Sequence, residues 1–227
     1  NEFRSHTGKV DHNLSNRHRV FVRYAQTYQL FSAGQLFETP TTGTDRYRRM
    51  KGAGFDDVFV FNPQFLMNFR YGFSYFQQEQ VPLSQGFDPA SIGLNPALIA
   101  QLDPQGRQFP QLNIDGYTSI GGATSNNAIT NFHSWNTDFT KIAGRHTLRF
   151  GGEFRLYREH NYNFNFGVPA YNFAAAWTRG PLDNSPVAPI GQGMASFLLG
   201  LPTGGQLNTN ASLAEQSSTT GMYVQDD

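Results

Sequence analysis

The sequence contains no cysteine, few lysines and no excess of either charge. Without cysteine there can be no disulfide framework, no thiolate metal site and no cysteine nucleophile. Lysine occurs only at positions 9, 51 and 141, and 17 basic residues balance 17 acidic ones. A chain without a positive field has no general electrostatic attraction for nucleic acid, so we expect no nucleic-acid partner.

Long apolar runs are also absent. The longest runs, such as Ala195 to Leu201, are far shorter than the roughly 18 residues that a membrane helix needs. The mean hydropathy is −0.47. A transmembrane β-strand needs only about 9 to 11 residues, and half of them can be polar. The sequence therefore excludes a spanning helix but leaves a spanning barrel open.

Recognisable catalytic motifs are missing as well. Metalloprotease, Walker, G-x-S-x-G and calcium-loop patterns do not occur. Gly191-Gln192-Gly193 lacks the third glycine of a dinucleotide fingerprint and does not follow a strand. The six histidines are scattered, and the pairs Asp56-Asp57 and Asp226-Asp227 are typical of solvated strand ends. We expect no enzyme activity, no cofactor and no metal site.

What the sequence does contain is alternation of apolar and polar residues. Between residues 146 and 158, one parity contains Leu148, Phe150, Phe154 and Leu156, and the other contains Thr147, Arg149, Glu153, Arg155 and Tyr157. Between Phe65 and Tyr75, six large apolar residues fall on one parity. A period of two indicates β-strands. In residues 55–61, Val58 and Val60 compete with Phe59 and Phe61 for the apolar face.

The connections between the predicted strands are short and long in turn. This rhythm is typical of transmembrane barrels, which have tight turns on one side of the membrane and large loops on the other. The sequence predicts an all-β fold: an antiparallel up-and-down meander of about seven strands that forms a partial transmembrane β-barrel. Its long extracellular loops carry short helices near 96–101 and 190–199. The predicted strands are 2–11, 17–29, 55–61, 65–78, 131–141, 146–158 and 219–227; the predicted long loops are about twenty residues after 29, including the basic run 46–51, then 79–130 and 161–213.

Aromatic residues on the predicted apolar face orient this barrel. Tyr24, Tyr28, Tyr71, Tyr75 and Trp135 lie toward the long-loop ends of their strands, where an interfacial girdle is expected. High β propensity of Tyr and Trp is the alternative explanation.

Charged residues on the opposite parity are the candidate site. On lipid, an arginine at the bilayer midplane would cost about 2 to 4 kcal/mol, so this parity should face the lumen. Pairing of Arg with Glu across strands, which would hold the wall together, is one interpretation, and a lining that contacts substrate is the other. The lumen-facing candidates are Arg70, Arg149, Glu153, Arg155 and Tyr157, and Arg23 shares their parity.

Three segments resemble one family. His146 to Arg155, with the sequence HTLRFGGEFR, resembles a strand of TonB-dependent outer-membrane receptors, especially the Oar-like group. The stretch from Pro189 to Pro202 and the final Tyr223-Val224-Gln225-Asp226-Asp227 are similar to the same group. The resemblance implies a cell outer membrane location and a 22-stranded barrel closed by a plug, with uptake energised through TonB.

On this resemblance, residues 1–227 are expected to be a partial receptor barrel domain, without the plug and the remaining strands. The chain starts at Asn1 and stops within a predicted strand, so we interpret it as an internal fragment. The expected partners are outer-membrane lipid, TonB through the plug, and a bulky nutrient such as a siderophore, a glycan or a peptide. The alternatives are a passive porin or adhesin-like barrel and a soluble secreted glycan-binding β-sandwich.

Overall fold

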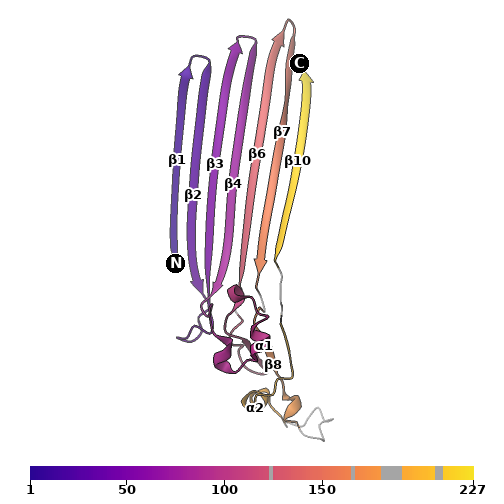
Figure 1. Cartoon of the computed structure of the whole chain (residues 1–227). Helices are drawn as coiled ribbons and strands as arrows, with labels where there is room; N and C mark the ends of the chain where they lie inside the picture. Colours follow the sequence, from indigo (N-terminus) through magenta and orange to yellow (C-terminus); the bar gives the residue numbers. More distant parts are fainter. Residues whose placement is uncertain (123–124, 165–166, 180–190, 208–211) are drawn as a thin grey trace.

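Seven long antiparallel strands form one open sheet (Figure 1). The structure is a computed structural model that describes residues 1–122, 125–164, 167–179, 191–207 and 212–227. The strand order β1-β2-β3-β4-β6-β7-β10 follows the chain, so the predicted up-and-down meander is confirmed. The strands are β1 (Glu2–Ser15), β2 (His18–Ala33), β3 (Thr44–Asn62), β4 (Phe65–Pro82), β6 (Asn126–Ala143), β7 (His146–Asn163) and β10 (Leu213–Asp226).

The three short connections lie at one end of the sheet, where turn residues satisfy the backbone locally (Figure 1). The Asn62 side-chain oxygen accepts a hydrogen bond from the Gln64 backbone N–H at 3.0 Å. Gly144 has a φ of 67°, a conformation that favours glycine. The first turn is tighter than the predicted 12–16, because β1 continues to Ser15.

At the other end the strands are longer than predicted. The predicted strand 55–61 is the last part of β3, which begins at Thr44. The basic run 46–51 therefore lies in a strand and not in a loop, and the connection before it spans only 34–43. At about 3.3 Å per residue, the 18 residues of β4 extend about 60 Å, well beyond what a bilayer core requires. Outside the apolar band both faces of a strand can be polar, so period two disappears there.

The register has a constant stagger. Val20, Asp57, Phe69, Thr137 and Gly152 lie in one row across five strands. Val20 is two residues from the first residue of β2, Phe69 is four from that of β4, and Gly152 is six from that of β7. The turn ends thus step by about two residues per hairpin, visible as a staircase in Figure 1. A stagger of constant sign is what closure of a barrel requires.

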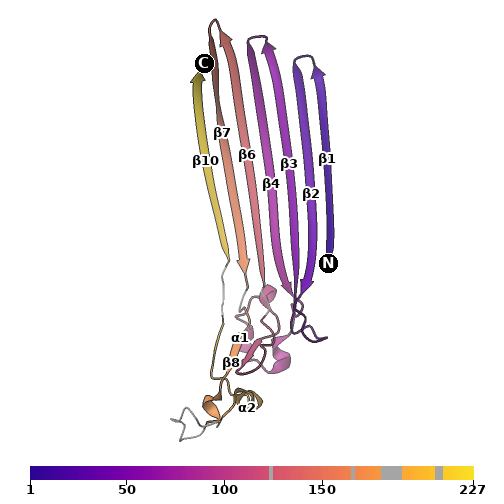
Figure 2. The ribbon, with the colours of Figure 1, turned by 180° about the vertical axis from the view of Figure 1, so that it is seen from behind.

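The two long connections fold into a substructure of their own, here called the loop cluster, at the end opposite the short turns (Figure 2). Residues 111 and 170 start two parallel strands, a pairing that the sequence did not predict. The predicted helices are confirmed near 96–101 and 190–199, although Ile190 lies outside the described residues. The elements are β5 (Gln111–Ile114), β8 (Ala170–Phe173), β9 (Gly204–Gln206), α1 (Pro96–Ile99), α2 (Gly193–Leu198), η1 (Pro89–Ile92), η2 (Pro104–Gly106) and η3 (Ala175–Trp177).

The buried core belongs to the loop cluster. Among the described residues, Leu102, Ile114, Val168, Ala170 and Phe173 are buried, and all lie in the loop cluster, whereas in the seven-stranded sheet Pro82 is buried where β4 meets that cluster. Ser196 of α2 is fully buried and donates from its hydroxyl to the Ala174 carbonyl at 2.7 Å. None of the described helices is long and apolar enough to cross a membrane.

Candidate functional site

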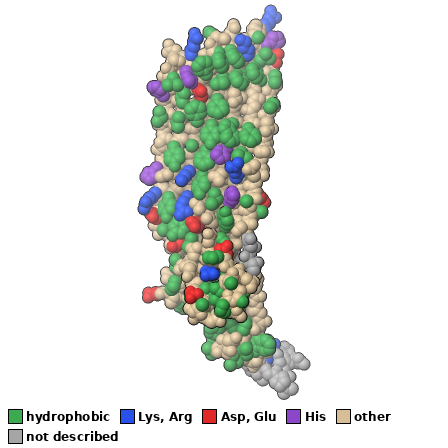
Figure 3. Space-filling model, in the orientation of Figure 1, with side chains coloured by type: hydrophobic (Ala, Val, Ile, Leu, Met, Phe, Trp, Pro, Cys, Tyr) green, Lys and Arg blue, Asp and Glu red, His purple; other side chains and the backbone are tan. Residues whose placement is uncertain are grey.

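The register combines the apolar parities of separate strands into one face. Tyr71 lies opposite Phe55 on one side and Trp135 on the other, and Trp135 lies opposite Phe154. The Tyr71 and Trp135 ring centroids are 5.4 Å apart, and those of Trp135 and Phe154 are 5.5 Å apart. Figure 3 shows hydrophobic side chains along the sheet in this view. The predicted apolar faces are therefore one continuous surface.

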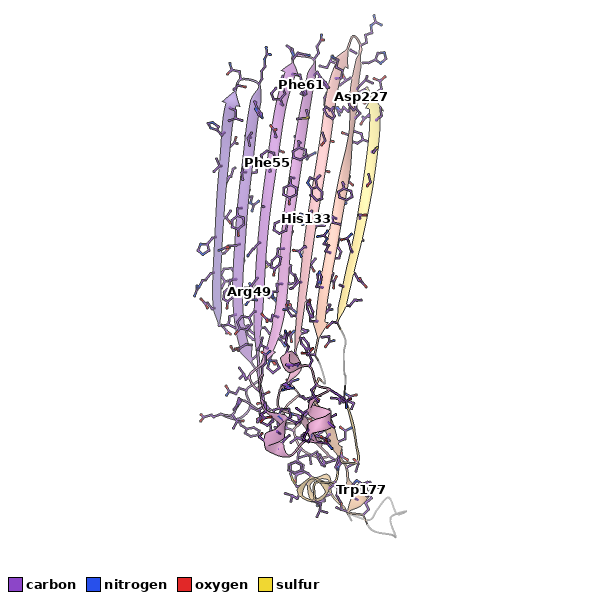
Figure 4. The ribbon with its side chains drawn as sticks, in the orientation of Figure 1. Arg49, Phe55, Phe61, His133, Trp177 and Asp227 are labelled. Carbon is purple, nitrogen blue, oxygen red and sulfur yellow. The ribbon has the colours of Figure 1, made fainter. Side chains whose placement is uncertain are left out.

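The pairing of β3 with β4 shows which residues of the segment 55–61 lie on the apolar face. Phe59 lies opposite Met67 on the apolar face, whereas Val58 lies opposite Asn68 on the other face. The Phe61 ring stacks on Phe65 with centroids 4.8 Å apart. The phenylalanines therefore take the apolar face at the short-turn end (Figure 4).

One acidic residue interrupts the apolar face. Asp57 shares its parity, between Val20 and Phe69. Its Oδ1 lies 2.7 Å from Nε2 of His18. The predicted reading of Asp57 as a solvated strand-end residue is therefore wrong, because the residue lies within β3 and is paired.

The five candidate residues share the opposite face. Arg70 and Glu153 lie in one row with Asn136 between them, while Arg155 and Tyr157 lie further along β7 toward the loop cluster. Arg149 lies toward the short turns and approaches Asp227 at 3.8 Å. Their shared parity holds in the sheet; that they line a lumen and contact substrate stays a prediction.

The candidates do not converge on one site. The Arg155 guanidinium contacts Glu153 at 2.8 Å within β7, so the expected pairing of Arg with Glu across strands is wrong for this pair. The Tyr157 hydroxyl donates to Glu159 at 2.8 Å, also within β7. Residues two apart in a strand lie on the same face, which makes such contacts possible.

A cross-strand network does exist, and it joins the predicted candidate Arg70 to Asp138 and Tyr223, which the sequence did not single out as site residues. Arg70 Nη2 donates to Oδ2 of Asp138 at 2.6 Å, and the Tyr223 hydroxyl donates to Oδ1 of the same carboxylate at 2.8 Å. Tyr223 reaches over Gly151, where a Cβ would overlap the carbonyl oxygen of Thr137. The sequence signal was the pair Gly151-Gly152 inside a strand, since strand glycines often mark close approach.

This network, here called the Asp138 network, couples β4, β6 and β10 across β7. One carboxylate accepts bonds from a guanidinium and a phenol on opposite sides, and charge-assisted bonds are the stronger class. Nothing in it pairs a nucleophile with a base. Within the described part of the chain, no group of three or more His, Asp or Glu side chains could hold a metal ion.

A polar cavity lies where the loop cluster joins the sheet. Its volume is ≈ 480 Å³, and it lies among the ends of β4, β6 and β7 and the segment before β5. Its carboxylate, Glu79, is paired with Arg49 at 2.9 Å, and none of the described residues that line the cavity is basic. The lining includes Gln80, Gln85, Gln105, Asn126, Asn127 and Tyr162. Amides and a phenol can donate to and accept from a neutral polar ligand.

Inside the loop cluster, burial affects the side chains of Gln108 and Tyr171. Gln108 is 1% exposed, and neither polar atom of its side chain has a hydrogen-bond partner. Burial also raises the pKa of the Tyr171 phenol on β8. Both residues lie in segments that the sequence predicted as irregular loop.

Residues 1–227 match the family described as outer membrane beta barrel domain. Neither curated proteins nor solved structures give a significant match.

Proposed function

The chain belongs to the family of outer membrane β-barrel domains, and from this premise we propose that it is part of the wall and outward loops of a TonB-energised receptor for a bulky nutrient. Its location is the outer membrane, and its fold is an antiparallel barrel meander. The soluble secreted sandwich is therefore excluded.

The aromatic face is proposed to contact lipid and the Asp138 network to face the lumen. An aromatic surface gains from burial in lipid, whereas arginine there costs about 2 to 4 kcal/mol at the midplane. The sheet has two unpaired edges, β1 and β10. Since closure removes such edges, we propose that further strands complete the barrel in the whole receptor.

The observation that carries the receptor proposal is the loop cluster. Residues 83–125 and 164–212 are long connections, and their described parts pack together with a buried core. A folded cluster offers a preorganised ligand surface, and the cavity of ≈ 480 Å³ lies at its base. No catalytic role is proposed for any residue.

The test is to place the complete gene product in planar lipid bilayers and measure its conductance. A plugged receptor should stay closed, and it should bind the periplasmic domain of TonB in a pull-down assay. A steady open channel that does not bind TonB would instead establish a passive porin.

A further inference from the structure

A cluster of basic residues follows the apolar face on the loop-cluster side. The last apolar row across the strands contains Tyr24, Phe73 and Leu156. The next two rows of the same face contain four cations and no carboxylate. We call these cations the basic belt: Arg4, Arg49, Lys51 and Arg158, flanked by His6 and His160.

Local partners neutralise the basic belt only in part. Glu2 pairs with Arg4, and Glu79 pairs with Arg49 at 2.9 Å. Four cations minus these two carboxylates leave a formal charge of +2. Lys51 lies over the Tyr75 ring at 5.7 Å, and Arg158 donates to the Gln216 side chain at 2.8 Å. Neither of these contacts neutralises a charge.

The belt is hollowed between β1, β2 and β3. A cavity of ≈ 360 Å³ lies there, and its lining includes Arg4, Arg49, Lys51 and His6, with one carboxylate, Glu2, which is paired with Arg4. Guanidinium and ammonium groups around such a space match the charge and hydrogen-bonding needs of a phosphate. Figure 4 shows Arg49 on the loop-cluster side of Phe55 and His133.

The opposite margin of the apolar face has no such belt. Toward the short turns, the strands of this face carry one basic residue besides histidine, Lys141, and they also carry Asp57 and Asp226. A general preference of membrane interfaces for cations would produce belts on both sides. The asymmetry points to a partner in the leaflet next to the loop cluster.

We infer that the basic belt binds phosphorylated headgroups of lipids in the outer leaflet. The belt borders the face that contacts acyl chains, so one lipid can place its chains on the aromatic rows and its phosphate in the hollow beside Arg4, Arg49 and Lys51. Arg158 lies three strands away in the same row as Lys51 and can bind the phosphate of a neighbouring lipid. Basic residues near an anionic membrane surface contribute about 1 kcal/mol each. This site requires the outward orientation of the aromatic face but not TonB-driven uptake.

The experiment uses the complete gene product in nanodiscs that contain phosphatidylglycerol and phosphatidylcholine. Native mass spectrometry counts the two lipids retained by the protein. The belt variant is Arg49→Gln, Lys51→Gln and Arg158→Gln. The matched control is Arg23→Gln, Arg46→Gln and Arg48→Gln. These residues lie on the opposite face, and their replacement removes the same total charge.

The belt variant should lose preference for phosphatidylglycerol about fivefold per cation removed, while the control keeps it. Equal loss in both triple variants, or no loss in the belt variant, overturns the inference. So does complete displacement of the lipid by excess inorganic phosphate, which would reveal a site for free phosphate. If the belt variant does not show heat-modifiable migration, Lys51→Gln alone must show the fivefold loss. A failed TonB pull-down would leave this result unaffected.

Discussion

The seven-stranded sheet and the loop cluster bury apolar surface in opposite ways. On the edge of the sheet, Met222 is 85% exposed and Val224 is 79% exposed, whereas in the loop cluster Val168 is 1% exposed. The loop cluster is built like a small water-soluble domain around Phe173 and its neighbours. In the aromatic rows of the sheet Phe154 is 40% exposed, and we propose that lipid covers these rows. On this proposal the loop cluster suits water and the aromatic face suits lipid.

Phe173→Ala should have the largest effect, and that effect should be confined to the loop cluster. Phe173 is 6% exposed and packs against Phe197 of α2, with centroids 5.3 Å apart. Truncation should destabilise the loop cluster by about 3 to 5 kcal/mol, because a cavity remains in its core. Limited proteolysis of intact cells should cut the loops while heat-modifiable migration of the barrel persists. The control is Tyr117→Ala, since Tyr117 is 56% exposed; equal cleavage of both variants would contradict a distinct core.

Phe69→Arg tests whether the aromatic face of the sheet contacts lipid. A cation on the aromatic face should cost about 2 to 4 kcal/mol near the midplane and reduce assembly into the outer membrane. Ser74→Arg is the matched control in the same strand, because Ser74 lies on the opposite face. Assembly is measured by heat-modifiable migration in membrane fractions. If Ser74→Arg fails and Phe69→Arg assembles, the two faces are inverted.

Tyr223→Phe probes the Asp138 network. Loss of the bond to Asp138 should lower the stability of the barrel by about 1 kcal/mol, the scale of one hydrogen bond. Urea unfolding of the reconstituted complete protein measures the change. Tyr24→Phe is the comparison, because the bond from its hydroxyl to Gln26 stays within β2. A network that couples strands predicts a larger loss for Tyr223→Phe than for Tyr24→Phe.

The double variant His18→Leu with Asp57→Leu should have the smallest effect. It replaces a polar pair on the aromatic face with two side chains that suit lipid. Exchange of both partners for apolar residues is often close to neutral, whereas removal of one partner is costly. We therefore expect a change within about 1 kcal/mol for the double variant and a larger loss for Asp57→Leu alone, both measured by urea unfolding of the reconstituted protein. A loss in the double variant as large as that in Asp57→Leu would mean that this part of β3 is not exposed to lipid.

Strands could be predicted where the two faces of the sheet differ in polarity. Between Phe65 and Tyr75 the alternation was clear, because six large apolar residues share one face; this is the face that we propose contacts lipid. The run 46–51 was mistaken for loop, because Tyr47, Arg49 and Lys51 on one face are as polar as Arg46 and Arg48 on the other. Beyond the apolar band a strand has water on both sides, and its periodicity no longer identifies it.

The sequence by itself determined the short turns and the apolar parity of each strand, because each depends on neighbours along the chain. Tertiary structure alone decided the stagger and the register that places Arg70 and Glu153 on one face. It also decided the reach of Tyr223 over Gly151 to Asp138, and the pairing of β5 with β8. These contacts join residues tens of positions apart. Their register depends on packing between strands and loops, for which a local pattern carries no signal.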